Sequence, residues 1–457
     1  MSLTVQVKNI GIIKQAKFSL GDLTIICGEN NTGKTYIAYA LYGFLSSWRE
    51  FIPITISDVQ IQHLFTEKTL KIDLSRTGDW ILSDACENYT KQLDEIFAAS
   101  KGTFQNSEFH FLSNEIDICS EEYNGSYGSF LLFSKREGSE ELTLTLKMEK
   151  GKEREIDATI VRNAINVIIK NAPFFDSVPK PFIFSSERTG VSIFRKELDY
   201  ARSRLLDDVA YADKNIDMRQ LLSKAYQSYP SPIKENIDFS RRLDDFVKNK
   251  SFIAKEHPDV LEDFADIVGG EYAVTQQDQL YYIPRGTQTK LTMVESSSAV
   301  RSLLDIGFYL RHIAEKRDLI MIDEPELSLH PENQRRIARL FARLANIGVK
   351  VFITTHSDYI IKELNTLIML NHDKPHLKTI AEENGYQESE LIKADQVKVY
   401  VAETALMPLE EGQQKRRRGH TLVPAKIHPK FGIEVPSFDK TIDEMNRIQD
   451  EIVWGEE

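Results

Sequence analysis

The most constraining feature of the sequence is a glycine-containing loop between a strand pattern and a helix pattern. Segment 28–35 reads Gly-Glu-Asn-Asn-Thr-Gly-Lys-Thr and matches G-x-x-x-x-G-K-[ST] in full. The run before it, 23–27, is nearly all apolar and is typical of a strand buried on both faces. After it, apolar residues recur at helical spacing through 37–45. A strand, such a loop and a helix in this order predict a phosphate-binding turn.

We expect this loop to hold phosphate mainly through its backbone, because N–H groups of the loop and of the helix start point at an anion. Gly33 permits a backbone angle that a Cβ would obstruct. Lys34 would place positive charge on the β- and γ-phosphates, and Thr35 would offer a hydroxyl to Mg²⁺. The alternative, a chance match in a glycine-containing turn, fits the flanking patterns poorly. ATP and Mg²⁺ are the expected ligands, and the predicted binding residues are Gly28, Glu29, Asn30, Asn31, Thr32, Gly33, Lys34, Thr35 and Tyr36.

Two adjacent carboxylates end a second apolar strand pattern. The run 319–322 is followed by Asp323 and Glu324. Ligands of open α/β sheets bind at the carboxyl ends of the strands, so both acids should face a ligand. We expect Asp323 to hold Mg²⁺ through its water shell and Glu324 to orient or deprotonate the attacking water. The alternative is a turn-forming acidic pair before Pro325.

A histidine follows the next strand pattern, 351–355. An imidazole at that strand end can contact the γ-phosphate or the attacking water. The predicted catalytic set is therefore Lys34, Glu324 and His356. The alternative for His356 is a helix start with Ser357 as the N-cap.

Three consecutive serines, Ser296, Ser297 and Ser298, precede a helical pattern over 299–308. Hydroxyls and free N–H groups at a helix start make a second phosphate-binding site. A plain serine N-cap is the alternative, and it accounts for one serine but not three.

Composition and charge narrow the class of protein. The 457 residues are 41% hydrophobic and 28% charged, which excludes global disorder. A net charge of −12 argues against a protein that coats nucleic acid over its whole surface. Nucleic acid contact would be confined to local basic stripes such as 335–343 or 415–418. Three cysteines without CxxC spacing and no long apolar window predict a cytoplasmic protein without a membrane partner.

Alternating strand and helix patterns after residue 280 predict an α/β P-loop NTPase head with a mixed or parallel sheet and N-terminal antiparallel strands. We expect a compact inserted lobe to interrupt this head, with one part mostly helical. The tail should end in an amphipathic helix that includes Met445 and Ile448. The predicted domains are 1–50 and 271–370 for the two halves of the head, 51–190 and 191–270 for the β-containing and helical parts of the lobe, and 371–457 for a tail that can bind a partner.

The order of these motifs resembles the ABC-type ATPase heads of the SMC, Rad50 and RecF group. The most specific string is 322–331, Ile-Asp-Glu-Pro-Glu-Leu-Ser-Leu-His-Pro. Within the group the sequence is closest to the AAA15 and overcoming-lysogenisation-defect-like (OLD-like) ATPases of bacterial anti-phage systems. The resemblance covers about 1–45 and 280–370.

The resemblance implies that two heads pair head to tail. The site for ATP on one loop would be completed by Ser297 or a neighbour on the other head. Segment 326–330 would lie across the interface between the two heads, and His356 would be the switch histidine. The serine segment lacks the usual glycine of the family, so the register of the serines stays open. Segment 185–188, Ser-Ser-Glu-Arg, is either close to this site or an ordinary surface turn.

These observations predict an ATPase that works as a dimer or higher oligomer and gates a separate effector, a nuclease or toxin, in an anti-phage system. The tail lacks the Asp-x-Asp pair of a Toprim nuclease, so no intrinsic nuclease is expected. One alternative is a RecF-like repair protein, which predicts ATP-dependent DNA binding with a steep salt dependence. The other is an ATP-locked scaffold with little turnover.

Overall fold

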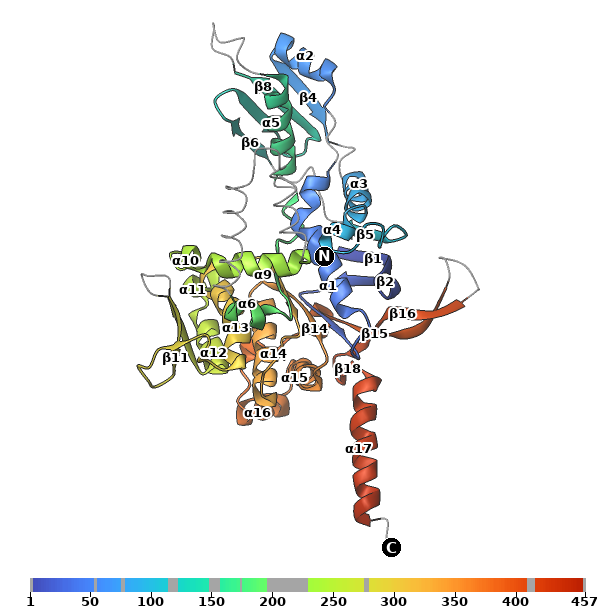
Figure 1. Cartoon of the computed structure of the whole chain (residues 1–457), viewed down its shortest axis with the longest axis vertical. Helices are drawn as coiled ribbons and strands as arrows, with labels where there is room; N and C mark the ends of the chain where they lie inside the picture. Colours follow the sequence, from blue (N-terminus) through green and yellow to red (C-terminus); the bar gives the residue numbers. More distant parts are fainter. Residues whose placement is uncertain are drawn as a thin grey trace, which may run out of the picture.

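A mixed β-sheet forms the centre of the head (Figure 1). The computed structural model describes residues 3–52, 56–74, 79–113, 122–147, 157–172, 175–194, 229–274, 279–408 and 416–454. Within these residues the sheet has nine strands, in the order β5-β1-β2-β16-β15-β3-β14-β13-β9. In that order they are Glu108–Ser113, Leu3–Ile10, Ile13–Leu20, Arg416–Pro424, Val397–Pro408, Leu23–Cys27, Lys350–Thr355, Leu319–Asp323 and Pro181–Phe184.

One half of this sheet is parallel and the other half is mainly antiparallel. From β15 to β9 each strand runs parallel to its neighbour. Strand β16 runs antiparallel to β15, and β1 pairs antiparallel with both β2 and β5. The predicted mixed sheet with N-terminal antiparallel strands is therefore confirmed.

Both faces of the parallel half are buried, as the apolar strand patterns predict. Alternate residues of a strand point to opposite faces. Ile26, Met321 and Phe352 accordingly join one apolar core, which contains helix α1 (Lys34–Ser47). Their neighbours in sequence join the second core, with helices α13 (Ser298–Phe308), α14 (Pro331–Asn346) and α15 (Asp358–Leu370).

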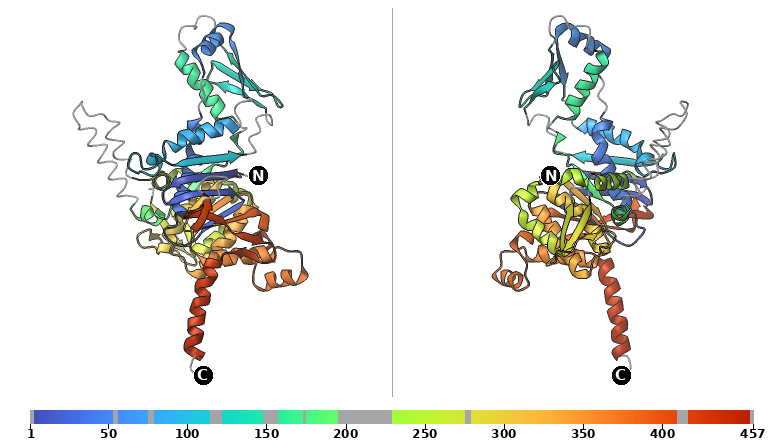
Figure 2. Two further views of the ribbon diagram at one scale, coloured as in Figure 1. Left: turned by 90° about the vertical axis from the view of Figure 1, so that its right-hand side faces the viewer. Right: turned by 60° about the vertical axis from the view of Figure 1, so that its left-hand side comes forward.

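The inserted segment contains a small lobe at the opposite end of the molecule from the C-terminal helix (Figures 1 and 2). Its antiparallel sheet has the order β4-β8-β7-β6. Helix α5 buries Val161, Ile165 and Ile168 at helical spacing. The lobe elements are β4 (Thr69–Asp73), β6 (Tyr123–Tyr127), β7 (Leu131–Lys135), β8 (Glu141–Leu146), α2 (Asp58–Glu67) and α5 (Ala158–Lys170).

The remaining inserted elements lie against the head. Helix α3 (Asp79–Thr90) packs on β5. The described part of the predicted helical region carries α6 (Arg188–Ile193), α9 (Ser231–Arg241), α10 (Leu243–Phe246), α11 (Phe252–Glu256) and α12 (Pro258–Val268). Residues 195–228 of that region lie outside the described residues. Strand β11 (Leu280–Pro284) pairs antiparallel with both β10 (Gly270–Val274) and β12 (Leu291–Thr292).

The predicted domain boundaries differ from the structure at two places. Strands β5 and β9 fall in the predicted insert, yet both belong to the head sheet. Strands β15 and β16 fall in the predicted tail, yet β15 pairs directly with β3, the strand that precedes the phosphate-binding loop. Val435 still belongs to the core, and helix α17 (Pro436–Trp454) projects from the head (Figure 1).

The arginine stripe predicted over 335–343 is neutralised inside the fold. Arg335 and Arg339 both donate to the buried carboxylate of Glu363 on α15, at 2.7 and 2.6 Å. Arg343 is 3% exposed and pairs with Asp259 and Asp263 on α12. These guanidinium groups connect α14 to α12 and α15, whereas Arg336 is exposed and pairs with Glu332 of its own helix.

Cys27 and Cys86 are buried free thiols, and burial raises the pKa of each to about 12. Cys119 lies outside the described residues. Across the portions of the chain that the structure describes, no helix combines the length and apolar character needed to cross a membrane.

Candidate active site

The loop 28–33 joins β3 to α1 at the carboxyl edge of the parallel strands. Gly28 and Gly33 have φ angles of 137° and 97°, and Asn31 has 60°. A Cβ on Gly28 would lie 2.5 Å from the carbonyl oxygen of Ala402 on β15. Because such a contact is too close, the loop needs glycine at this position to run against β15.

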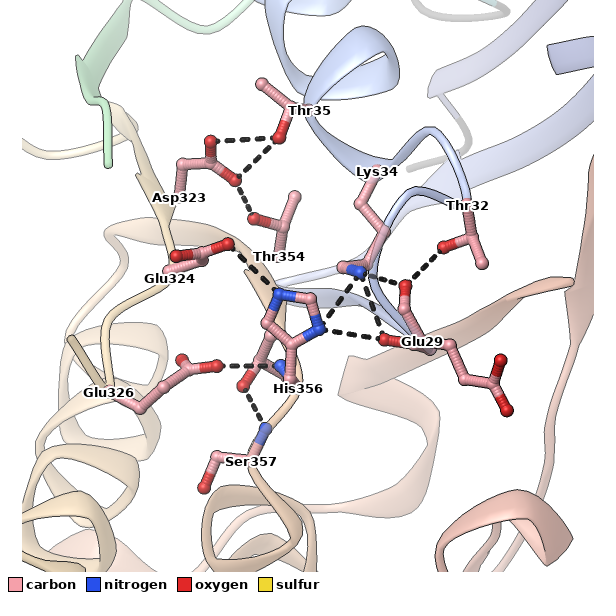
Figure 3. A network of polar contacts seen from close by, with 12 residues as sticks. Glu29, Thr32, Lys34, Thr35, Asp323, Glu324, Glu326, Thr354, His356 and Ser357 are labelled. Carbon is pink, nitrogen blue, oxygen red and sulfur yellow. Dashed lines mark hydrogen bonds and ion pairs between the residues drawn. The ribbon is translucent and has the colours of Figure 1, made fainter. Parts of the chain in front are cut away.

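Lys34 lies across this loop and binds its carbonyl groups (Figure 3). Its Nζ donates to the oxygens of Gly28 at 3.0 Å and Glu29 at 2.7 Å. Burial lowers the pKa of Lys34, and the carboxylate of Glu324 opposes that change. Thr32 also donates to the Glu29 carbonyl, at 2.8 Å, so one cation and one hydroxyl fix the loop.

Asp323 lies between two threonine hydroxyls at the end of β13. Thr35 Oγ1 donates to Asp323 Oδ2 at 3.1 Å, and Thr354 Oγ1 donates to Oδ1. Asp323 is buried, which raises its pKa to about 6, although the hydrogen bond from Thr354 acts in the opposite direction. Paired hydroxyl and carboxylate oxygens at a helix start are the ligand chemistry that Mg²⁺ prefers. Thr35 and Asp323 therefore fit a magnesium ion.

Glu324 and His356 form a second pair beside Lys34. Glu324 Oε1 and His356 Nε2 are 3.0 Å apart, and this hydrogen bond is the main cause of a lowered pKa for Glu324 and a raised pKa for His356. His356 Nδ1 lies 3.1 Å from the carbonyl oxygen of Gly28. The oxygens of Glu324 and Gly28 favour protonation of the two ring nitrogens, whereas the Lys34 ammonium, 3.2 Å from Nδ1, opposes it. The backbone N–H of His356 also donates to Glu326 Oε1, at 2.7 Å.

The structure brings the predicted catalytic residues into one polar network (Figure 3). Lys34 Nζ is 3.2 Å from His356 Nδ1, and the other ring nitrogen of His356, Nε2, contacts Glu324. These residues follow β3, β13 and β14, whose carboxyl ends lie side by side. Thr354 was not predicted, although a polar residue at the end of an apolar strand is the signal that could have identified it.

Four residues of the predicted binding loop do not bring their side chains into this network. Glu29, Asn30 and Asn31 are exposed, and only main-chain groups of Glu29 contact Lys34. The Tyr36 ring packs on Phe97, with ring centroids 5.4 Å apart, and covers Gly11. Tyr36 thus contributes to the site only through its position in the first turn of α1.

The three serines differ in their surroundings. Ser296 is buried and donates to the Thr292 carbonyl at 2.8 Å. Ser297 is the N-cap of α13 and accepts from Val300 N, whereas Ser298 Oγ accepts from Arg301. Ser297 and Ser298 are exposed. The N-cap alternative is therefore correct for Ser297, and two of the three hydroxyl groups face outward at a helix start.

Segment 185–188 lies next to the site. Strand β9 pairs with β13 so that Phe184 is opposite Ile322. Glu187 Oε2 accepts from the hydroxyl of Tyr39 on α1, at 3.2 Å. Arg188 is buried and donates to the carbonyl oxygen of Asp323 at 2.7 Å. The alternative of an ordinary surface turn is wrong for Arg188.

The chain is similar to several solved structures. Solved structures similar to the chain include an Smc head bound to the C-winged helix domain of ScpA, at 11% identity and a TM-score of 0.34, covering 92% of this chain and 96% of that one. The SMC head domain from Thermotoga maritima matches at 10% identity and a TM-score of 0.31, covering 93% and 100%. An Smc head with an extended coiled coil, bound to the C-terminal domain of ScpA and derived from Pyrococcus furiosus, matches at 12% and 0.31, covering 98% of each chain.

Among curated proteins, none matches this sequence. The family model of the AAA ATPase domain, AAA_15, matches residues 1–361. This match covers the phosphate-binding loop, the Asp-Glu strand end and the histidine that follows β14. Since it spans well over half of the chain, the protein belongs to the AAA_15 family of AAA ATPase domains, as the sequence motifs predicted.

Proposed function

We propose that the protein binds ATP with Mg²⁺ and hydrolyses it to ADP and phosphate. The observation that supports this most directly is the network in which Lys34, Glu324 and His356 meet beside the loop. Lys34 binds the phosphates, and Thr35 and Asp323 would hold the metal. When bound, Mg²⁺ supplies positive charge that offsets the charge of the phosphates. Glu324 orients or deprotonates the attacking water, and His356 fixes the Glu324 carboxylate through Nε2.

We propose further that two heads pair head to tail, so that α13 of one head completes the site of the other. Ser297 and Ser298 support this because they are exposed at a helix start, where N–H groups attract an anion. The hydrogen bonds of all three serines stay within their own segment, 292–301. The exposed hydroxyl groups of Ser297 and Ser298, which act as acceptors in these bonds, are therefore available to donate to a phosphate on a second copy.

Mixing two inactive variants tests this pairing. Ser297→Asp keeps an N-cap, because Asp is a good cap, but places a carboxylate against the phosphate of the partner head. Lys34→Ala disables the loop of its own head only. We expect each variant alone to be inactive and the equimolar mixture to recover about one quarter of the wild-type rate, since half of the dimers then hold one complete site. Phosphate release measures the rate.

Ser296→Ala is the matched control, because Ser296 is buried and bonds within its own segment. We expect this variant to keep wild-type turnover without a partner. A mixture of Ser297→Asp and Lys34→Ala that stays inactive, although the two variants associate, would show that α13 does not act in trans.

For the effector, we propose attachment through α17. This helix leaves the head (Figures 1 and 2), and Met445, Ile448 and Ile452 are 56%, 43% and 75% exposed along it. An apolar stripe on an exposed helix suits the groove of another protein. The resemblance to anti-phage ATPases makes a nuclease or toxin the proposed partner, and no nuclease activity is proposed for this chain itself.

Placing charges on that stripe tests the attachment. We expect Ile448→Asp with Ile452→Asp to abolish copurification with the product of the neighbouring gene and to leave ATP hydrolysis unchanged. Asp450→Asn, a substitution of a charged residue of α17, is the control that should keep the complex. Wild-type complex formation by the double variant would contradict the role of α17.

The RecF-like alternative is less well supported than the effector model. Three arginines of one predicted contact, the stripe on α14, are paired with carboxylates of α12 and α15. The other predicted contact is the basic segment 415–418. Lys415 lies outside the described residues, and Arg417 and Arg418 are exposed on β16. Under this alternative, we propose DNA or RNA contact at strands β15 and β16.

A further inference from the structure

Arg188 is an arginine buried inside the head, where charged side chains are rare. It begins α6, directly after the edge strand β9, and it is 1% exposed. Its guanidinium group makes four hydrogen bonds, and every acceptor is a main-chain carbonyl oxygen. A buried cation with this set of partners needs an explanation beyond simple packing.

The acceptors come from three separate parts of the head. Nε donates to Ser302 on α13 at 2.8 Å. Nη1 donates to Asp323 at 2.7 Å and to Ser185 at 2.9 Å, and Nη2 donates to Glu324 at 2.8 Å. One rigid planar group thus connects α13, the end of β13 and the segment after β9.

The contacts to Asp323 and Glu324 explain an unusual backbone conformation. Two consecutive carbonyl groups point at the same guanidinium, and Glu324 has a φ of 52°. The left-handed region is unfavourable for an ordinary residue, so the surrounding structure must hold it there. Arg188 therefore helps to fix the main chain from which the Glu324 carboxylate is aimed at His356.

The contact to Ser302 connects the same group to the serine segment. Ser302 lies about one turn after Ser298 in α13, and helices move as rigid elements. A displacement at the N-terminus of α13 would shift the Ser302 carbonyl and, through Arg188, the carbonyls of Asp323 and Glu324. Burial lowers the pKa of Arg188, but Asp323 and Glu326 favour its charged form.

We propose that Arg188 is a positioning residue that couples α13 to the catalytic glutamate, so that seating of the second head on Ser297 and Ser298 aligns Glu324. This inference rests on the proposed function and adds to it the residue through which pairing controls turnover. Lysine cannot replace the arginine, because its donors radiate from one atom and cannot span three separated acceptors.

Arg188→Lys in the full chain tests the coupling. We expect ATP affinity to stay within about threefold of wild type and ATP-dependent self-association to persist, because no contact of Arg188 reaches the loop 28–35 or the exposed serines. We expect turnover per paired head to fall about 10- to 100-fold, as for a misplaced catalytic group. Equilibrium ATP binding, sedimentation with ATP, and phosphate release across a range of protein concentrations measure these three quantities.

Arg343→Lys is the matched control, since Arg343 is an equally buried arginine whose partners lie on α12. We expect its turnover per paired head to equal that of wild type. Wild-type turnover per paired head in Arg188→Lys would overturn the proposal, and so would an equal loss in Arg343→Lys, which would indicate general damage to the core.

Hydrogen exchange of the wild-type chain gives a second test, which holds even if Arg188→Lys fails to fold. On addition of ATP and Mg²⁺, we expect amides of 299–306 and of 323–327 to gain protection together. Protection of 299–306 with no change in 323–327 would overturn the coupling. Failure of the proposed function looks different, because the wild-type chain would then bind no ATP or would release no phosphate from it.

Discussion

Replacing Glu324 by glutamine is expected to slow ATP hydrolysis by about 10²- to 10⁴-fold and to leave ATP binding intact. The glutamine has the same shape, and its carbonyl oxygen can still accept the bond that joins Glu324 to His356 at 3.0 Å. It has no carboxylate to take a proton from water. The hydrogen bond from His356 lowers the pKa of Glu324, so the wild-type side chain is an ionised base at neutral pH.

Two measurements separate these effects. Phosphate release under single-turnover conditions reports the chemical step, and equilibrium dialysis with ATP reports binding. Glu332→Gln is the control, because Glu332 is a half-exposed carboxylate that pairs with Arg335 and Arg336 on α14. Hydrolysis by Glu324→Gln at the wild-type rate would show that another group activates the water. Negligible turnover by the wild-type chain, with ATP-dependent assembly, would instead favour the scaffold alternative.

The sequence predicted those parts of the site whose position follows from local strand and helix patterns. The loop 28–33 lies between a strand and a helix that both show their periodicity. Asp323, Glu324 and His356 follow two further apolar strands, and parallel strands end at one edge of a sheet. The prediction needed one further assumption, that these strands are neighbours in the sheet, and β3, β14 and β13 are indeed neighbours.

Long-range pairing explains what the sequence did not predict. Strand β15 enters the sheet next to β3 from a segment 374 residues away along the chain, since Val397 pairs with Leu23, and no local pattern indicates that partner. The arginines of α14 look like a free basic stripe in sequence, because their acidic partners Glu363 and Asp263 come from other helices. Arg188 bonds only main-chain oxygens, which every residue has, so residue types alone could not identify its role.

Replacing Lys34 by alanine is expected to weaken ATP binding by about 100-fold or more. A hydrogen bond to a charged group contributes about 1.5–3 kcal/mol, and each 1.4 kcal/mol is a factor of ten in affinity. Lys34 is also buried near the carboxylates of Glu324 and Asp323. Without the ammonium, a polyanionic ligand would meet the carboxylates of Glu324 and Asp323 with one cation fewer to offset them, which further disfavours binding.

Equilibrium binding of ATP with Mg²⁺ measures this loss, and thermal unfolding without nucleotide shows whether the fold persists. Lys350→Ala is the matched control, because Lys350 is a partly buried lysine that pairs with Asp22 at 3.3 Å at the start of β14, the end of the strand opposite to His356. We expect this control to bind ATP like wild type. If Lys34→Ala stays folded and binds ATP with wild-type affinity, the phosphates do not lie on this loop, and the assignment of the whole site to the carboxyl edge of β3 is wrong.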